Sequence, residues 1–146
     1  MSLVDVAVTT QMFLGARAVW EPKVIDSVFL TRAEPLSIGL SSIGAKLKTI
    51  YIDDPEGLVI SFRGKPKIKI SAPVAPGIVD KLNISSWYQM KPNDFHSVNV
   101  QNGTVALDGE REVELLPGRQ VAVALDLNGP YVVDVEVVLK GLSGQY

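Results

Sequence analysis

Charged side chains gather at one predicted hairpin tip. Residues 102–114 (NGTVALDGEREVE) are typical of a strand, a tight polar turn and a second strand. Asp108-Gly109 is a strong two-residue turn signal, because glycine adopts positive φ without strain and aspartate tolerates it. The turn would place Glu110 and Arg111 beside Asp108. Residue types alone leave the role of this tip open, since most charged hairpin tips are simply solvated turns.

The sequence carries none of the common self-sufficient catalytic motifs. It has no GxxxxGK[ST] or GxGxxG phosphate loop, and no GxSxG nucleophile motif. No serine stands with a histidine and an acid in a recognisable order. His96 is the only histidine and cysteine is absent, so we predict no metal site. A surface or turn position is commoner for such a histidine than a catalytic one. We therefore assign no catalytic residue to this chain.

One short helix is predicted over residues 36–47. Ser37 is its candidate N-cap, since serine oxygens accept hydrogen bonds from the first free N–H groups of a helix. Apolar residues recur at helical spacing along one stripe, namely Leu36, Leu40, Ile43 and Leu47.

Small residues inside this predicted helix could indicate a ligand. Gly39 and Gly44 each cost about 1 kcal/mol relative to alanine in a helix, and glycine there indicates close approach of another backbone or a ligand. Ser41 and Ser42 lie between them. The alternative is a short helix that plugs a β core and carries two serines on its surface.

The rest of the chain has the alternating pattern of β-strands. Residues 64–66 would join two strands as a hairpin loop, residues 116–119 have the type II turn pattern, and residues 128–130 form a further turn. Strands at spacings of about 8–12 residues favour an all-β fold, a β-sandwich of mainly antiparallel strands with one short helix. Expected strands include residues 3–8, 13–20, 27–31, 58–62, 68–70, 121–127 and 133–139.

Composition limits the classes of function. The 146 residues are enough for a single domain with a sizeable core, and 47% are hydrophobic against 21% charged. A net charge of −2 argues against a nucleic-acid partner. No run reaches the roughly 18 apolar residues of a membrane helix, and no secretory signal is present. The absence of cysteine suits the cytoplasm.

The hairpin tip also carries a family resemblance. Residues 105–110 (VALDGE) resemble the V-S-x-D-G-Q motif in the C-terminal domain of ATP-dependent NAD kinases, with Ala106 in place of Ser and Glu110 in place of Gln. Residues 104–125, 13–20 and 31–45 resemble more closely the acetoin-catabolism protein X (AcoX) group of that superfamily. Residues 39–43 (GLSSI) resemble in part the nucleotide-contacting G-S-T-A-Y motif.

The resemblance implies a fold, ligands and partners. It implies the complex β-sandwich of the NAD kinase and diacylglycerol kinase superfamily, and a chain that is the C-terminal half of a two-domain protein. The whole protein would bind NAD and ATP against its own N-terminal Rossmann-like domain and transfer phosphate with a metal ion such as magnesium. It would be a homo-oligomer. The residues implied at the ligand are Asp108, Gly109, Glu110, Arg111, Gly39, Ser41 and Ser42.

Two functional hypotheses remain open from the sequence. The first is a nucleotide-cleft and oligomerisation domain, inactive as this chain alone because the G-G-D-G and N-E/D motifs of the N-terminal domain are absent. Glu110 in place of Gln adds a negative charge near any phosphate, which leaves open a different ligand or no kinase activity. The second is a non-enzymatic β-sandwich assembly module with no nucleotide role.

Overall fold

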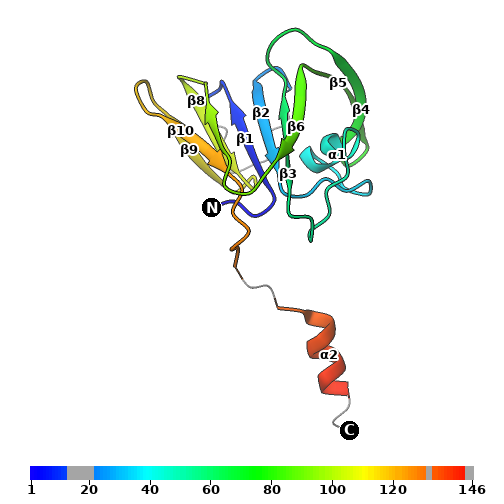
Figure 1. Cartoon of the computed structure of the whole chain (residues 1–146). Helices are drawn as coiled ribbons and strands as arrows, with labels where there is room; N and C mark the ends of the chain where they lie inside the picture. The colour runs from blue at the N-terminus through cyan, green and yellow to red at the C-terminus, as the bar shows by residue number, and fades with distance from the viewer. Residues whose placement is uncertain (13–21, 131–132, 144–146) are drawn as a thin grey trace.

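A six-stranded antiparallel sheet forms the centre of the molecule (Figure 1). The computed structural model describes residues 1–12, 22–130 and 133–143, so the strand predicted at 13–20 lies outside the described residues. From edge to edge the order is β6 (Ser86–Met90), β3 (Gly57–Ser61), β2 (Ile25–Leu30), β1 (Asp5–Thr9), β8 (Gly103–Leu107) and β9 (Arg111–Leu115).

Two smaller sheets cover the two faces of the central sheet. One pairs β4 (Ile68–Ala75) with β5 (Ile78–Ile84), and the other pairs β7 (Phe95–Val98) with β10 (Val121–Ala124). Successive strand residues point to opposite faces. Val28 and Leu30 therefore face the β4–β5 side, whereas Phe29 faces the β7–β10 side. Burial on both faces explains the unbroken apolar runs of the central strands, and the predicted β-sandwich is confirmed.

The predicted helix is shorter than its apolar stripe. Helix α1 spans Leu40–Ala45, and Leu36 is 98% exposed in front of it. Ser37 is not the N-cap. Gly39 occupies that position with φ of 87°, and its N–H donates to Pro73 O at 3.0 Å. This hydrogen bond holds the backbone of Gly39 against β4, so the residues before Gly39 do not join the helix.

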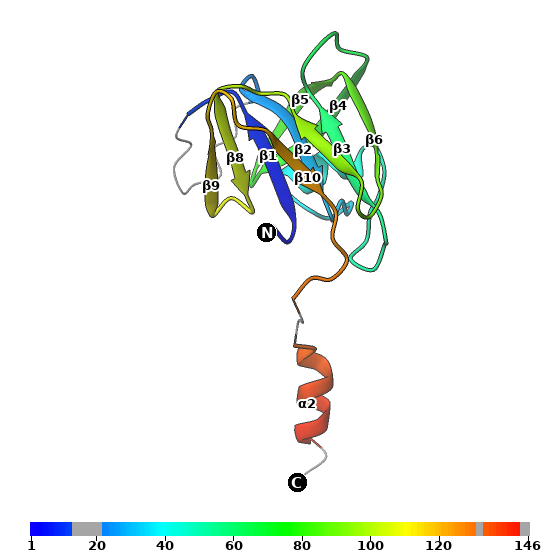
Figure 2. The same ribbon diagram turned by 60° about the vertical axis from the view of Figure 1, so that its left-hand side comes forward.

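The strand predicted at residues 133–139 is wrong. The structure has a helix there, α2 (Val135–Ser143), which lies apart from the sheets in both views (Figures 1 and 2). The Asp134 carboxylate caps the helix by accepting a hydrogen bond from Val137 N at 3.0 Å. Away from any sheet edge, a helix satisfies its own backbone groups and a lone strand does not.

Two turn predictions are confirmed and two fail. Glu110 N donates to Leu107 O across Asp108-Gly109, both of positive φ, and Arg119 N donates to Leu116 O across Gly118 at φ of 83°. The loop at 64–66 joins no hairpin, because β3 and β4 belong to different sheets. Residues 128–130 form no hydrogen-bonded turn.

Among the described residues, no helix has the length and apolar character that crossing a membrane requires.

Candidate functional site

An open cleft of about 720 Å³ lies between the central sheet and β10, next to the N-terminus. Phe29 and Met90 form part of its floor, and residues 1–6 form one wall. We call the side over β8, β9 and β10 the apolar end. It is lined mainly by Val105, Leu107, Val113, Val121, Val123, Leu125 and Leu127, and the charged residue Asp126 lies between the last two. We call the side over the ends of β1, β2 and β3 the polar end; it carries Asp5, Thr31, Arg32, Asp54 and Glu56.

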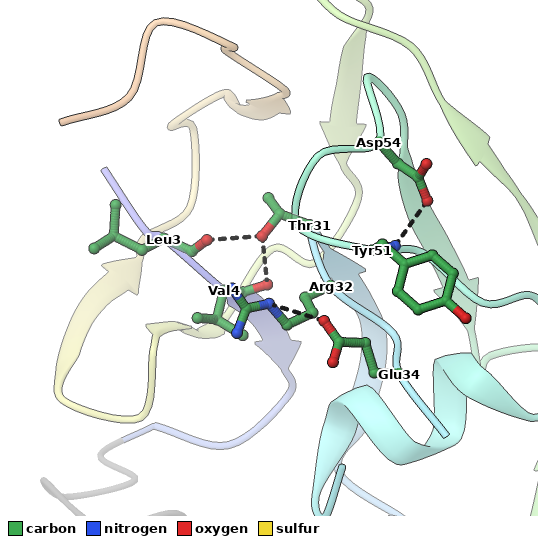
Figure 3. A network of polar contacts seen from close by, with 7 residues as sticks. All are labelled: Leu3, Val4, Thr31, Arg32, Glu34, Tyr51 and Asp54. Atoms are coloured by element: carbon green, nitrogen blue, oxygen red, sulfur yellow. Dashed lines mark hydrogen bonds and ion pairs between the residues drawn. The ribbon is translucent and has the colours of Figure 1, made fainter. Parts of the chain in front are cut away.

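Hydrogen bonds fix the side chains of the polar end (Figure 3). Thr31 Oγ1 donates to Leu3 O at 2.7 Å, which ties the end of β2 to the N-terminal wall. Arg32 Nε lies 3.4 Å from Glu34 Oε1. Because a guanidinium carries five N–H donors, one contact at Nε leaves donor capacity for an anion. Asp54 Oδ2 accepts from Tyr51 N at 2.7 Å and so orders the loop before β3.

Asp5 is the half-buried carboxylate of the polar end. It begins β1 and lines the cleft. Burial raises the pKa of Asp5 above its usual value, and the negative charge of Asp108 raises it further. Such a carboxylate can accept a hydrogen bond from a hydroxyl or amino group. Sequence analysis missed it, although an aspartate inside the valine-rich run VDVAV is itself unusual for a strand.

The predicted tip residue Asp108 holds the N-terminal wall in place. Its carboxylate accepts hydrogen bonds from Ser2 Oγ at 2.7 Å, from Val4 N at 2.8 Å, and from the Leu3 and Asp5 N–H groups. Burial alone would raise the pKa of Asp108, but these hydrogen bonds outweigh it and hold the pKa below its usual value. Asp108 does not line the cleft, whereas all four of its donor residues do.

The other tip residues lie around the same contact. Arg111 Nη2 donates to Met1 O, so a second side chain of the hairpin binds the N-terminal wall. Gly109 completes the turn at φ of 67°, and Glu110 is exposed. None of the three lines the cleft. The tip therefore acts on the cleft through residues 1–5, which it positions.

The second group of predicted residues lies elsewhere. Gly39, Ser41 and Ser42 belong to α1 and its N-cap, which pack on β4 and β2, whereas the tip extends from β8 and β9 on the far side of β1 (Figure 1). Ser42 Oγ donates to Gly39 O at 2.7 Å and to Pro73 O at 2.9 Å. The alternative of a short helix that plugs a β core agrees with the burial of Ile43 and Gly44, and the two serines are themselves buried in that contact. The structure does not bring the two groups together.

His96 is not in a turn, and only part of it is exposed. It lies half-buried on β7, with Nδ1 3.1 Å from Tyr88 Oη and its ring 6.1 Å from that of Phe29. Its Nε2 atom is buried without a partner in the described part of the chain. Over the same residues, no group of three or more His, Cys, Asp or Glu side chains could hold a metal ion.

Comparison with known proteins identifies relatives across most of the chain. Residues 1–128 match the family described as the acetoin catabolism protein X C-terminal domain. Acetoin catabolism protein X of Cupriavidus necator is 32% identical over 142 residues. That match covers 96% of this chain, and so extends into α2, but only 40% of the relative. No solved structure matches the chain.

Proposed function

Because this chain belongs to the acetoin catabolism protein X C-terminal domain family, we propose that it forms one wall of a nucleotide-binding cleft in a longer protein. The observation that carries the proposal is the cleft of about 720 Å³, with an apolar floor and a few polar groups at one end. Pockets for small molecules and cofactors commonly have this size, about 300–1,000 Å³, and a mainly apolar lining with a few polar groups.

The polar end supplies the chemistry that a nucleotide requires. The Asp5 carboxylate would accept a hydrogen bond from a ribose hydroxyl or an exocyclic amine, and Arg32 would bind a phosphate oxygen. Asp108 and Arg111 would act indirectly, by holding the wall that contains Asp5. This replaces the direct ligand contact implied by the family resemblance with a positioning role for the tip.

The whole protein would bind NAD and ATP between this domain and its own N-terminal Rossmann-like domain. Phosphoryl transfer to NAD, the activity of the superfamily, works by positioning and by electrostatic stabilisation with a metal ion such as magnesium. This chain would bind and orient the nucleotide, and the G-G-D-G and N-E/D motifs of the N-terminal domain would carry the phosphoryl-transfer chemistry. The lack of cysteine suits a cytoplasmic protein.

Titration calorimetry on the longer protein tests the proposal. We expect Asp5→Asn and Arg32→Ala each to weaken NAD or ATP binding about tenfold or more, since a lost hydrogen bond to a charged group costs about 1.5–3 kcal/mol. Asp53→Asn is the matched control, because Asp53 is exposed and outside the cleft lining. Unchanged NAD and ATP affinities in both cleft variants would refute a nucleotide site here.

A second candidate function is a non-enzymatic assembly module with no nucleotide role. The observation in its favour is the exposed apolar surface of α2, where Val135, Val138, Leu139 and Leu142 are 48–62% exposed. Exposed apolar surface of this kind marks interaction sites. A longer protein that binds neither NAD nor ATP but still associates through this domain would favour the assembly module.

A further inference from the structure

The chain contains two Asn-Gly pairs, Asn102-Gly103 and Asn128-Gly129. Asparagine is among the thermolabile residues of proteins, and a following glycine makes it most prone to spontaneous deamidation. The reaction begins when the backbone nitrogen of the glycine attacks Cγ, the carboxamide carbon of the asparagine. Glycine favours this attack because it has no Cβ to hinder the approach. The structure around each pair therefore decides whether the reaction occurs there.

The backbone at Asn102-Gly103 is fixed on both sides. Gly103 is buried at the start of β8, where it pairs with Leu115 of β9. It also lies against β1, so closely that a Cβ at this position would be 1.9 Å from Thr9 O. Attack requires the peptide plane between Asn102 and Gly103 to rotate, and that rotation would break the contacts with both neighbouring strands. The sheet therefore protects Asn102.

The backbone at Asn128-Gly129 has the opposite environment. Both residues are exposed, and they follow β10 in a segment that leaves the sheets (Figures 1 and 2). In the described part of the chain, Gly129 N has no hydrogen-bond partner, and a Cβ at Gly129 would meet no atom within 4 Å apart from its chain neighbours. Asn128 Nδ2 donates to Asp126 Oδ1 at 3.1 Å, but this contact is exposed and water can replace it. The carboxamide is therefore free to reach Gly129 N.

We propose that Asn128 is a site of spontaneous deamidation and that the fold selects it over Asn102. A bond forms between Gly129 N and Cγ of Asn128, and Nδ2 leaves as ammonia with the proton of Gly129 N. The product is a five-membered succinimide, which water then opens. Attack of water at Cγ gives aspartate. Attack at the main-chain carbonyl carbon gives isoaspartate, in which the main chain runs through Cβ and Cγ and is one carbon longer.

Deamidation changes the rim of the cleft. Asp126 and Gly129, on either side of this site, both line the apolar end or its mouth. Either product has a carboxylate in place of the carboxamide, so the chain gains one negative charge beyond its net −2. The hydrogen bond from Asn128 Nδ2 to Asp126 is lost, and two carboxylates then repel each other across the same contact. The modified chain therefore has a more negative cleft mouth.

This inference does not depend on the proposed nucleotide role. Deamidation is read from the covalent structure of the chain, so a cleft that binds no nucleotide would leave it intact. A chain that keeps Asn128 unmodified would leave the nucleotide proposal intact in turn.

Peptide mapping by mass spectrometry on the folded 146-residue chain tests the proposal. The protein is held in mildly alkaline buffer, which favours loss of the amide proton, and samples are digested at intervals. We expect the peptide with Asn128 to gain one dalton at least about tenfold faster than the peptide with Asn102, a difference of about 1.4 kcal/mol in activation free energy. Equal rates at the two sites, or no mass gain at Asn128, would overturn the proposal.

Two controls separate the effect of the fold from that of the sequence. In denaturant, both asparagines should deamidate at comparable rates, because the protection of Asn102 comes from the sheet. A difference that persists unchanged in denaturant would show that the fold selects nothing. Gly129→Ala should slow the reaction at Asn128 at least about tenfold and leave the rate at Asn102 unchanged, because the added Cβ hinders attack only at the first site. A Gly129→Ala chain that deamidates at the wild-type rate would also overturn the proposal.

Discussion

The hydrogen bonds at Asp108 make a quantitative prediction about stability and pH. The Asp108→Asn variant keeps the shape of the side chain and its tolerance of positive φ, but it removes the charge that the four donors share. Hydrogen bonds to an ionised acceptor are about twice as strong as neutral ones. Because the carboxylate is partly exposed, water replaces part of the loss, and we expect a cost of about 1–2 kcal/mol.

The Asp108→Ala variant should cost more. It removes every acceptor and also places alanine at φ of 54°, which adds about 1–2 kcal/mol. We expect a total of about 2–4 kcal/mol. For a domain of this size, 1 kcal/mol corresponds to roughly 3–4 °C in melting temperature, so both variants are measurable by thermal unfolding at pH 7. Glu110→Gln, which removes a charge from the same turn, is the control.

The pH dependence gives the sharper test. The folded-state pKa of Asp108 lies below its unfolded value, so its contribution is complete above the unfolded pKa and is lost as pH falls through the folded pKa. The difference in the free energy of unfolding between wild type and Asp108→Asn should therefore be largest near pH 7 and should shrink as pH falls below about 4. A stability difference that stays constant from pH 7 to pH 3, or an equal loss of stability in Glu110→Gln, would refute the role of the Asp108 carboxylate in holding residues 2–5.

Three further predictions follow from the same geometry. The pKa of Asp5 is raised in the folded state, so ionisation of Asp5 lowers the stability of the folded protein as pH rises through that pKa. We therefore expect Asp5→Asn to melt at a higher temperature than wild type at pH 7, and at the same temperature below about pH 4. A lower melting temperature of Asp5→Asn at pH 7 would contradict this. Gly103→Ala should cost about 2–3 kcal/mol in chemical denaturation, because its Cβ would lie 1.9 Å from Thr9 O, whereas Gly129→Ala, with no atom within 4 Å, should be nearly neutral. The chain alone should form no NADP from NAD, ATP and magnesium, and NADP formation above background would contradict this prediction.

Much of the sheet architecture could be predicted from the sequence. The alternation of apolar residues located seven of the ten strands that the structure describes, all except β5, β6 and β7, and the Asp108-Gly109 and Pro117-Gly118 pairs predicted their turns. These signals are local, because side-chain direction alternates along a strand and positive φ is set by residue type. The family membership also came from contiguous stretches of sequence.

The candidate site was predicted only in part. The sequence pointed to the hairpin tip, but not to residues 1–5 as the partner of Asp108, which lie more than 100 positions away. It also missed Asp5, whose importance depends on burial beside a second carboxylate. Cleft walls assembled from distant segments leave no spacing pattern in the chain.

The sequence by itself determined where most of the described strands and two of the four predicted turns form, because those preferences belong to single residues and their neighbours. Only the tertiary structure decided the state of residues 135–143 and the role of Asp108. The same valine-rich alternation that gives a strand in β10, where β7 pairs with it, gives a helix in α2, whose Asp134 cap and unpaired backbone favour internal hydrogen bonds. A β-strand needs a neighbour to satisfy its backbone, and where the neighbour lies is a property of the whole fold.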